Sequence, residues 1–326
     1  MDKIAILILG HKNPNQISKL VSSLANSYFD FYIHIDKKVD ILPFQKSLEN
    51  LKDMGIFFVK DRVKTYFFDF SLIDATCKCA NLAYTKGVYK YFVLLSGQDY
   101  PIKSKNYIYE YLIKNYPMCW IDMYRVDEAA LHGVNWVKNI GYFYTSQHLR
   151  KIILNIVGNK FYFSKYGKLV KLFAVIYDRI MTLIKGAPRD WLKSTQYTYS
   201  AGSHFWILPD IAIEHILNNY FYDKNLKKIF SHIGAPEESY FQTSLSTMKN
   251  LLLPNEFSQF ESPEKEMDNP ALRLIKWYSN GVKTNGHPDI WKIADKDFID
   301  NANALFARKF DMNIDVSILN YLDSKC

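Results

Sequence analysis

The first 123 residues alternate short apolar runs with amphipathic segments, and this alternation constrains the fold more than any other feature of the chain. The apolar runs predict strands at 4–9, 31–35, 56–59, 91–95 and 118–123. Helical periodicity predicts helices at 14–25, 44–51, 71–84 and 106–115. Buried strands separated by helices are typical of a mostly parallel sheet with both faces covered. The sequence therefore predicts a Rossmann-like α/β domain.

Polar residues follow four of these strands, at His11, Asp36, 60–62 and 96–99. In open sheets of this kind, ligands bind beyond the carboxyl ends of the strands. We therefore expect a binding crevice at this edge. Asp99 within it could orient a ribose, a sugar or a metal, or could simply close an Asx-turn.

No internal repeat divides the chain, and we expect a single domain spanning 1–326, with a strand at 205–208 and a helix at 211–217 in its second half. Residues 147–198 interrupt the pattern as a helical, basic insertion, and neither of its apolar runs reaches the length of a membrane span. The basic residues of its helical part are Arg150, Lys151, Lys160, Lys165, Lys168, Lys171, Arg179 and Lys185. Two interpretations remain open: a helical subdomain packed on the core, or an amphipathic surface that contacts acidic lipid.

The net charge of +8 favours an anionic partner, and the absence of a nucleic-acid-reading motif excludes DNA and RNA from our expectation. The apolar run at 4–9 is too short for a signal peptide. Cys77 and Cys79 form one C-x-C pair without a second pair or a nearby His, so the cysteines predict no zinc site. We expect a cytoplasmic protein with free thiols.

Two segments carry candidate chemistry. Glu237 and Glu238 follow a Pro-stiffened loop at the predicted start of a helix, where one carboxylate could act as a general base or both could complement the helix dipole. Arg308 and Lys309 lie in an apolar frame, either as residues at a helix end or as a clamp for a leaving diphosphate. The single Asp-x-Asp triplet, 295–297, has no strong strand before it and predicts a helix N-terminus, so we expect no metal site.

Six motifs occur together in one order: Ile33-His-Ile-Asp36, Leu95-Ser-Gly-Gln-Asp-Tyr-Pro-Ile-Lys103, Gly202-Ser-His-Phe-Trp206, Ala235-Pro-Glu-Glu238, Lys276-Trp-Tyr278 and Leu305-Phe-Ala-Arg-Lys-Phe-Asp311. With these motifs the chain resembles the branching β-1,6-N-acetylglucosaminyltransferases (core-2 and I-branching enzymes) and their peptide O-xylosyltransferase relatives, in a bacterial form. The resemblance runs from Lys3 to Asp311 and is weakest over 125–198. It implies a GT-A fold, inversion at the anomeric carbon, and catalysis with a UDP-sugar but without metal or other cofactor.

The resemblance also implies roles for particular residues. Glu238 matches the family's catalytic base. The residues expected at the donor are His34, Ile35, Asp36, Asp61, Arg62, Val63, Tyr91, Asp99, His287, Arg308 and Lys309. The residues expected at the acceptor are Trp206, Glu237, Trp277 and Tyr278. An Arg that the branching enzymes carry upstream of the Lys309 position is absent; His287 lies in the matching stretch, and we expect Arg308 to supply the missing charge.

These observations together predict transfer of N-acetylglucosamine, or in second place xylose, from a UDP-sugar to a hydroxyl of a glycan or lipid-linked glycan. The expected setting is bacterial surface polysaccharide synthesis, with peripheral contact at the inner, anionic membrane face. Two alternatives stay open: a non-catalytic nucleotide- or sugar-binding protein of the same fold, and a metal-dependent transferase that uses Asp99.

Overall fold

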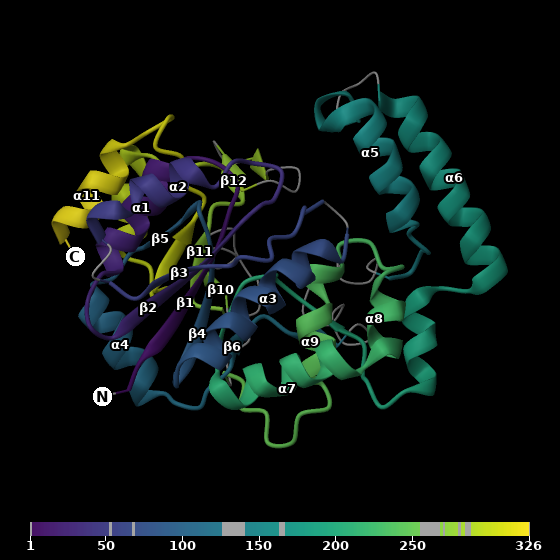
Figure 1. The fold of residues 1–326 in the computed structure, drawn as a ribbon, viewed down its shortest axis with the longest axis horizontal. Helices are drawn as coiled ribbons and strands as arrows, with labels where there is room; N and C mark the ends of the chain where they lie inside the picture. Colours follow the sequence, from purple (N-terminus) through teal and green to yellow (C-terminus); the bar gives the residue numbers. More distant parts are fainter. Residues whose placement is uncertain are drawn as a thin grey trace.

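A computed structural model describes residues 2–51, 54–66, 69–125, 141–162, 167–254, 268–269, 271–279, 282–283 and 288–325. Its centre is a six-stranded sheet in the order β3-β2-β1-β4-β9-β6 (Figure 1). The strands are β1 (Ile4–Gly10), β2 (Phe29–Ile35), β3 (Ile56–Phe58), β4 (Tyr91–Ser96), β6 (Trp120–Ile121) and β9 (Trp206–Pro209). The first four are parallel, and β9 is antiparallel to both β4 and β6. The predicted α/β class with a mostly parallel sheet is therefore confirmed.

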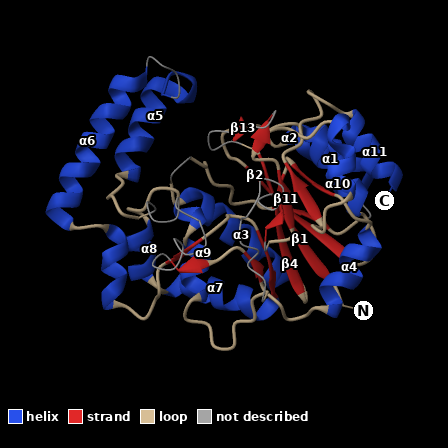
Figure 2. Ribbon diagram, turned by 180° about the vertical axis from the view of Figure 1, so that it is seen from behind, coloured by secondary structure: helices blue, strands red, loops and turns tan. Residues whose placement is uncertain are grey.

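Helices cover both faces of this sheet, and side chains of each strand alternate between two cores (Figure 2). Ala5 and Leu7 face one core, and Ile4, Ile6 and Ile8 face the other. The helices of the first core are α3 (Ser71–Lys86), α7 (Asp210–Tyr222), α8 (Lys224–Phe230) and α9 (Tyr240–Leu245). Those of the second are α1 (Pro14–Leu24), α2 (Leu42–Ser47), α4 (Lys105–Lys114), α10 (Lys296–Asp300) and α11 (Ser317–Lys325).

The chain forms α1 where Pro14 occupies the first helical turn, a position that needs no N–H donor. Ile17, Leu20, Val21 and Leu24 recur at the spacing of one helix face and are fully buried. The same agreement between pattern and packing holds for the other helices predicted up to residue 115, whose observed limits differ by a few residues.

A second sheet of four strands, which the sequence pattern did not predict, lies beside the first in the order β10-β11-β14-β5. Its strands are β5 (Asp99–Pro101), β10 (Asp268–Asn269), β11 (Arg273–Ile275) and β14 (Phe306–Arg308). Two further short pairs are β7 (Tyr124–Arg125) with β8 (Ser200–Ala201), and β12 (Tyr278–Ser279) with β13 (Val282–Lys283). Strand β14 runs between β5 and β11, so it joins residues near 100 to residues near 274.

The insertion forms a helical hairpin of α5 (Gln147–Tyr162) and α6 (Lys168–Lys185), which we call the α5–α6 hairpin. It projects from the body of the molecule, with α6 as the outermost element (Figures 1 and 2). None of the described helices has both the length and the apolarity needed to cross a membrane. The interpretation of 169–184 as the buried face of a core helix is wrong, because its large apolar side chains are exposed.

Candidate active site

The ends of the parallel strands bring the predicted donor residues to one edge of the sheet. The end of β1 pairs with the end of β2, and Leu9 pairs with Ser96 at the end of β4. His11, which follows β1, interacts electrostatically with Asp36, Arg308 and Lys309. Residues far apart in the sequence therefore share this edge, as the sequence predicts.

The loop after β3 is held against the end of β2 by several polar contacts. The backbone N–H of Val63 donates to His34 Nε2 at 2.9 Å, and Thr65 Oγ1 donates to Asp36 Oδ2 at 2.5 Å. The Arg62 guanidinium donates to the Val39 carbonyl at 3.0 Å. These contacts leave Asp61 with an 80% exposed side chain, paired with a lysine of α3. The loop from Asp61 to Val63 is thus fixed at the crevice.

His34 and Ile35 differ from the prediction in what their side chains do. Both are buried, so neither side chain reaches a ligand in the crevice. Burial lowers the pKa of His34 to about 4, which keeps its ring neutral and its Nε2 free to accept from Val63. His34 thus supports the loop through this contact, and a donor contact of His34 or Ile35, which stays a prediction, would come from the backbone.

Arg308 and Lys309 come from β14 and the residue that follows it. Trp291 holds this backbone, donating from its indole to the Arg308 carbonyl at 2.9 Å and from its amide to the Lys309 carbonyl at 3.0 Å. Both side chains are partly exposed. Burial lowers the pKa of Lys309, and the neighbouring charges of Arg308 and Lys12 lower it further. Like charges that disfavour one another in this way are stabilised when an anion binds between them.

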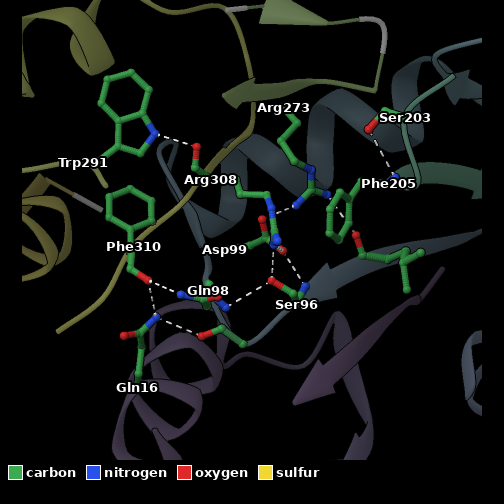
Figure 3. Close-up of polar contacts among 12 residues, drawn as sticks. Gln16, Ser96, Gln98, Asp99, Ser203, Phe205, Arg273, Trp291, Arg308 and Phe310 are labelled. Carbon is green, nitrogen blue, oxygen red and sulfur yellow. Dashed lines mark hydrogen bonds and ion pairs between the residues drawn. The ribbon is translucent and has the colours of Figure 1, made fainter. Parts of the chain in front are cut away.

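Asp99 lies beneath this cation pair, in a cluster that the sequence did not predict (Figure 3). It is fully buried and pairs with the equally buried Arg273 at 2.9 Å and with Arg308 at 3.6 Å. The guanidinium carbons of both arginines lie over the ring of Phe205, at 4.6 and 4.5 Å from its centroid. Arg273 also donates to the Leu94 carbonyl at 2.9 Å. Asp99 therefore holds Arg308 from its buried side, and its burial does not fit the predicted contact with the donor.

The same contacts argue against the alternative in which Asp99 binds a metal ion. Two guanidinium groups already neutralise this carboxylate, and both would repel a divalent cation. Among the described residues, no group of His, Cys, Asp or Glu has an arrangement that could hold a metal ion.

The carboxylate pair lies in a short 3-10 helix, Pro236–Glu238. The Glu238 carbonyl accepts from the Gly202 amide at 2.8 Å, and this contact ties the helix to the segment before β9. Gly202 approaches so closely that a Cβ there would lie 1.8 Å from the Asp122 carbonyl oxygen. Only glycine fits this position, which explains the glycine of the Gly-Ser-His-Phe-Trp motif.

The electrostatics of the pair suit proton transfer. Burial raises the pKa of Glu237, and the neighbouring Glu238 carboxylate raises it further. Burial also raises the pKa of Glu238, with Asp122 as a second cause. The Oε2 atom of Glu237 is buried without a hydrogen-bond partner among the described residues. A carboxylate whose pKa lies near neutrality is poised to take a proton from a hydroxyl.

Asp122 is a residue that the sequence analysis missed, although it lies at the end of a predicted strand. Burial raises its pKa to about 6. Its carboxylate accepts from the Ser203 amide at 3.0 Å, and Gln242 donates to the carbonyls of Asp122 and Ser203 at 3.1 and 2.8 Å. Its position directly after an apolar strand was the feature of the sequence that could have identified it as a candidate site residue.

The segment from Gly202 to Phe205 connects the two charged groups of the site. Its first residue bonds to the backbone of Glu238, and its last lies against Arg273 and Arg308. Three residue steps of extended chain span at most about 11 Å. The backbone of Glu238 and the guanidinium of Arg308 are therefore connected through one short segment.

Comparison with known proteins agrees with this geometry. The family model of the Core-2/I-branching enzymes matches residues 4–301. The chain belongs to the Core-2/I-branching enzyme family. No curated protein matches the chain at a significant level. Members of the family are glycosyltransferases, which implies a sugar donor and a glycan acceptor. Arg308 and Lys309 lie beyond the matched residues, so their place in this site rests on the geometry.

In this Core-2/I-branching family member, the positions of Tyr91 and Trp206 do not fit the ligand contacts predicted for them. Tyr91 opens β4 at the amino end, opposite the crevice, and its hydroxyl donates to the Asn115 and Met118 carbonyls. Trp206 is fully buried and packs edge-on against Phe241, so no sugar can lie on its ring. Both side chains lie on strands of the central sheet and pack into its two hydrophobic cores.

The remaining predicted residues have mixed outcomes. Trp277 is partly exposed between β11 and β12, near the second sheet. Tyr278 begins β12, and its side chain lies outside the described part of the chain, as does His287. Asp295 and Asp297 lie at the start of α10, as the predicted helix N-terminus requires, and the Asp295 carboxylate accepts from Lys276 at 2.8 Å.

Proposed function

We propose that this family member is an inverting, metal-independent glycosyltransferase of the GT-A type that uses a UDP-sugar. The observation that carries the proposal is the Gly202–Phe205 segment, which connects the backbone of Glu238, a carboxylate residue of raised pKa, to the guanidinium of Arg308. Inverting transfer needs these two groups: a base for the acceptor hydroxyl and positive charge for the leaving diphosphate. Family membership supports the sugar-transfer chemistry.

In the proposed reaction, Glu238 removes the proton from the acceptor hydroxyl as its oxygen attacks the anomeric carbon. The bond from that carbon to the UDP oxygen breaks on the opposite face, so configuration inverts. The transition state resembles the oxocarbenium ion of glycoside hydrolysis. One carboxylate suffices, because UDP leaves as an anion and needs no acid.

Lys309 and Arg308 would stabilise the charge that grows on the diphosphate. In the proposal they take the place of a divalent cation. Burial and the cationic neighbours lower the pKa of Lys309, so its ammonium would be stabilised by a bound diphosphate. The loop from Asp61 to Val63, supported by His34 and Asp36, would hold the nucleoside. Glu237, Trp277 and Tyr278 would contact the acceptor sugar.

For the donor sugar we propose N-acetylglucosamine, with xylose as the second candidate, and for the acceptor a glycan or lipid-linked glycan. The proposed setting is bacterial surface polysaccharide synthesis at the cytoplasmic face of the inner membrane. The choice of sugar follows the resemblance to the two branches of the family, and the choice of acceptor and setting follows the basic insertion at 147–198.

Release of UDP from a panel of UDP-sugars, with a glycan acceptor and with or without EDTA, tests the proposal. We expect release with one donor and equal rates in EDTA. Release that EDTA abolishes and Mn²⁺ restores would favour the metal-dependent alternative. UDP-sugar binding without release from any donor would favour a non-catalytic binding protein.

A further inference from the structure

The outer face of α6 consists of large apolar side chains in contact with solvent. We use this name for Leu169, Leu172, Phe173, Ile176, Ile180 and Leu183. Their spacing of three or four residues places them on one face of the helix. All are exposed, from 47% for Ile176 to 87% for Leu183. Burying such side chains is favourable, so an uncovered face of this size indicates a partner.

The other side of α6 packs against the protein with unusually polar contacts. Ala174 and Asp178 are buried, and Asp178 accepts from the Ser146 amide at 2.9 Å and pairs with Arg150 of α5. An amphipathic helix of a globular protein normally turns its apolar face inward. Here the polar side is anchored and the apolar face points outward. An apolar groove between α5 and α6, lined by Leu149 and Ile153, continues this face.

The charge of the hairpin identifies the partner's chemistry. Residues 147–185 contain eight basic residues and a single acidic one, Asp178, whose charge Arg150 already neutralises. The net charge of the whole chain is +8, so this hairpin carries most of it. A second copy of the chain would bring two such hairpins together with like charges opposed. An anionic lipid surface offers both an apolar layer and negative charge.

We propose that the outer face of α6 docks on an anionic lipid bilayer, with the helix lying along the surface. An 18-residue helix is about 27 Å long, enough for several apolar side chains to enter the lipid together. Lys168 and Arg179 flank the face on the same helix, where they would meet lipid phosphates. The proposal concerns binding alone and does not depend on which sugar is transferred.

Docking in this way would keep the candidate site near the bilayer. At the base of the hairpin, Gln147 donates to the Phe230 and Ile233 carbonyls at 2.9 and 2.8 Å, directly before the carboxylate pair. Lys151 pairs with Asp69 at 2.9 Å, and Asp69 is one of the charges that raise the pKa of Glu237. A rigid path of a few residues thus joins the docking face to the site.

Vesicle co-sedimentation of the full chain tests the proposal, with phosphatidylglycerol vesicles and phosphatidylcholine vesicles compared. We expect binding to the anionic vesicles that weakens with salt, and little binding to the zwitterionic ones. The variant L169D/L172D/L183D removes three exposed side chains that do not line the groove. Its partition onto anionic vesicles should fall at least about tenfold, which corresponds to roughly 1.4 kcal/mol.

V88D is the matched control, because Val88 is 90% exposed before β4 and lies outside the hairpin. It should bind as the parent does, and K168E/R179E should bind less. Thermal unfolding of each variant verifies that the fold is intact. Absence of parent binding to anionic vesicles would overturn the proposal, as would unchanged binding by the triple variant. A dimer that the triple variant dissociates, without vesicle binding, would reassign the face to a protein contact.

Discussion

Replacing Arg273 by Met tests whether the buried ion pair beneath the cations holds the site together. Arg273 and Asp99 are both fully buried and 2.9 Å apart. Removing one partner leaves a buried charge without its neutralising neighbour, which costs about 3–5 kcal/mol. A free energy of unfolding of about 5–15 kcal/mol is typical, so the loss would be a large part of the total.

The assay is urea unfolding followed by far-UV circular dichroism, with UDP affinity measured by calorimetry. Asp99→Asn should also destabilise, because it leaves the buried Arg273 cation without its neutralising carboxylate. The double variant D99N/R273M should recover part of the loss, since neither buried charge remains. In R273M we also expect weaker UDP binding, because Arg308 becomes the main partner of Asp99.

Two results would refute this reasoning. R273M with a loss below about 1 kcal/mol would mean that Asp99 does not depend on Arg273. Asp99→Asn with stability unchanged within about 0.5 kcal/mol, but with metal-dependent activity abolished, would make Asp99 a ligand of the substrate complex.

Three further predictions concern the carboxylates and Lys309. Glu238→Gln should lower turnover by roughly 10²–10⁴-fold and leave UDP affinity nearly unchanged. If steady-state kinetics show that Glu237→Gln is inactive and Glu238→Gln is active, the assignment of the base is reversed. A base must be deprotonated and the pKa of Glu238 is raised, so kcat/KM should fall as pH drops below neutrality. Asp122→Asn should shift this acid limb of the pH profile to lower pH. An unmoved limb would exclude Asp122 as a cause of the raised pKa of Glu238. Lys309→Ala should weaken UDP binding by about 1.5–3 kcal/mol in calorimetry while the parent stays active in EDTA, whereas an unaltered UDP affinity would remove Lys309 from the diphosphate site.

The central sheet could be predicted from the sequence because its strands are apolar throughout and its helices are strongly amphipathic. Those signals are local, and β1, β2 and β4 with their helices agree with the prediction. The second sheet could not be predicted in this way. Strands β5 and β14 have three residues each and are stabilised by pairing with each other across 200 residues of sequence.

The candidate site shows the same division. The strand-end rule predicted that His11, Asp36, 60–62 and 96–99 share one edge, and the pairing of β1, β2 and β4 and the contacts of the loop after β3 agree with it. It could not show that Asp99 is neutralised by Arg273, since that partner lies 174 positions away in a segment without a motif. The resemblance placed at the donor the Tyr that opens the strand, but in the structure this residue lies at the end of β4 away from the crevice. The sequence also does not show how deeply a side chain is buried, and burial decides whether the side chain of His34 can contact a ligand.

The position of β14 in the middle of the second sheet has a consequence for synthesis of the protein. Both neighbours of β14, β5 and β11, leave the ribosome before it. Until Phe306–Arg308 emerges, each of these strands has an open edge, and open edges favour pairing with other chains. The carboxylates are translated earlier than Arg308 and Lys309. A nascent chain therefore cannot complete the proposed diphosphate site until β14 has emerged and paired with its neighbours.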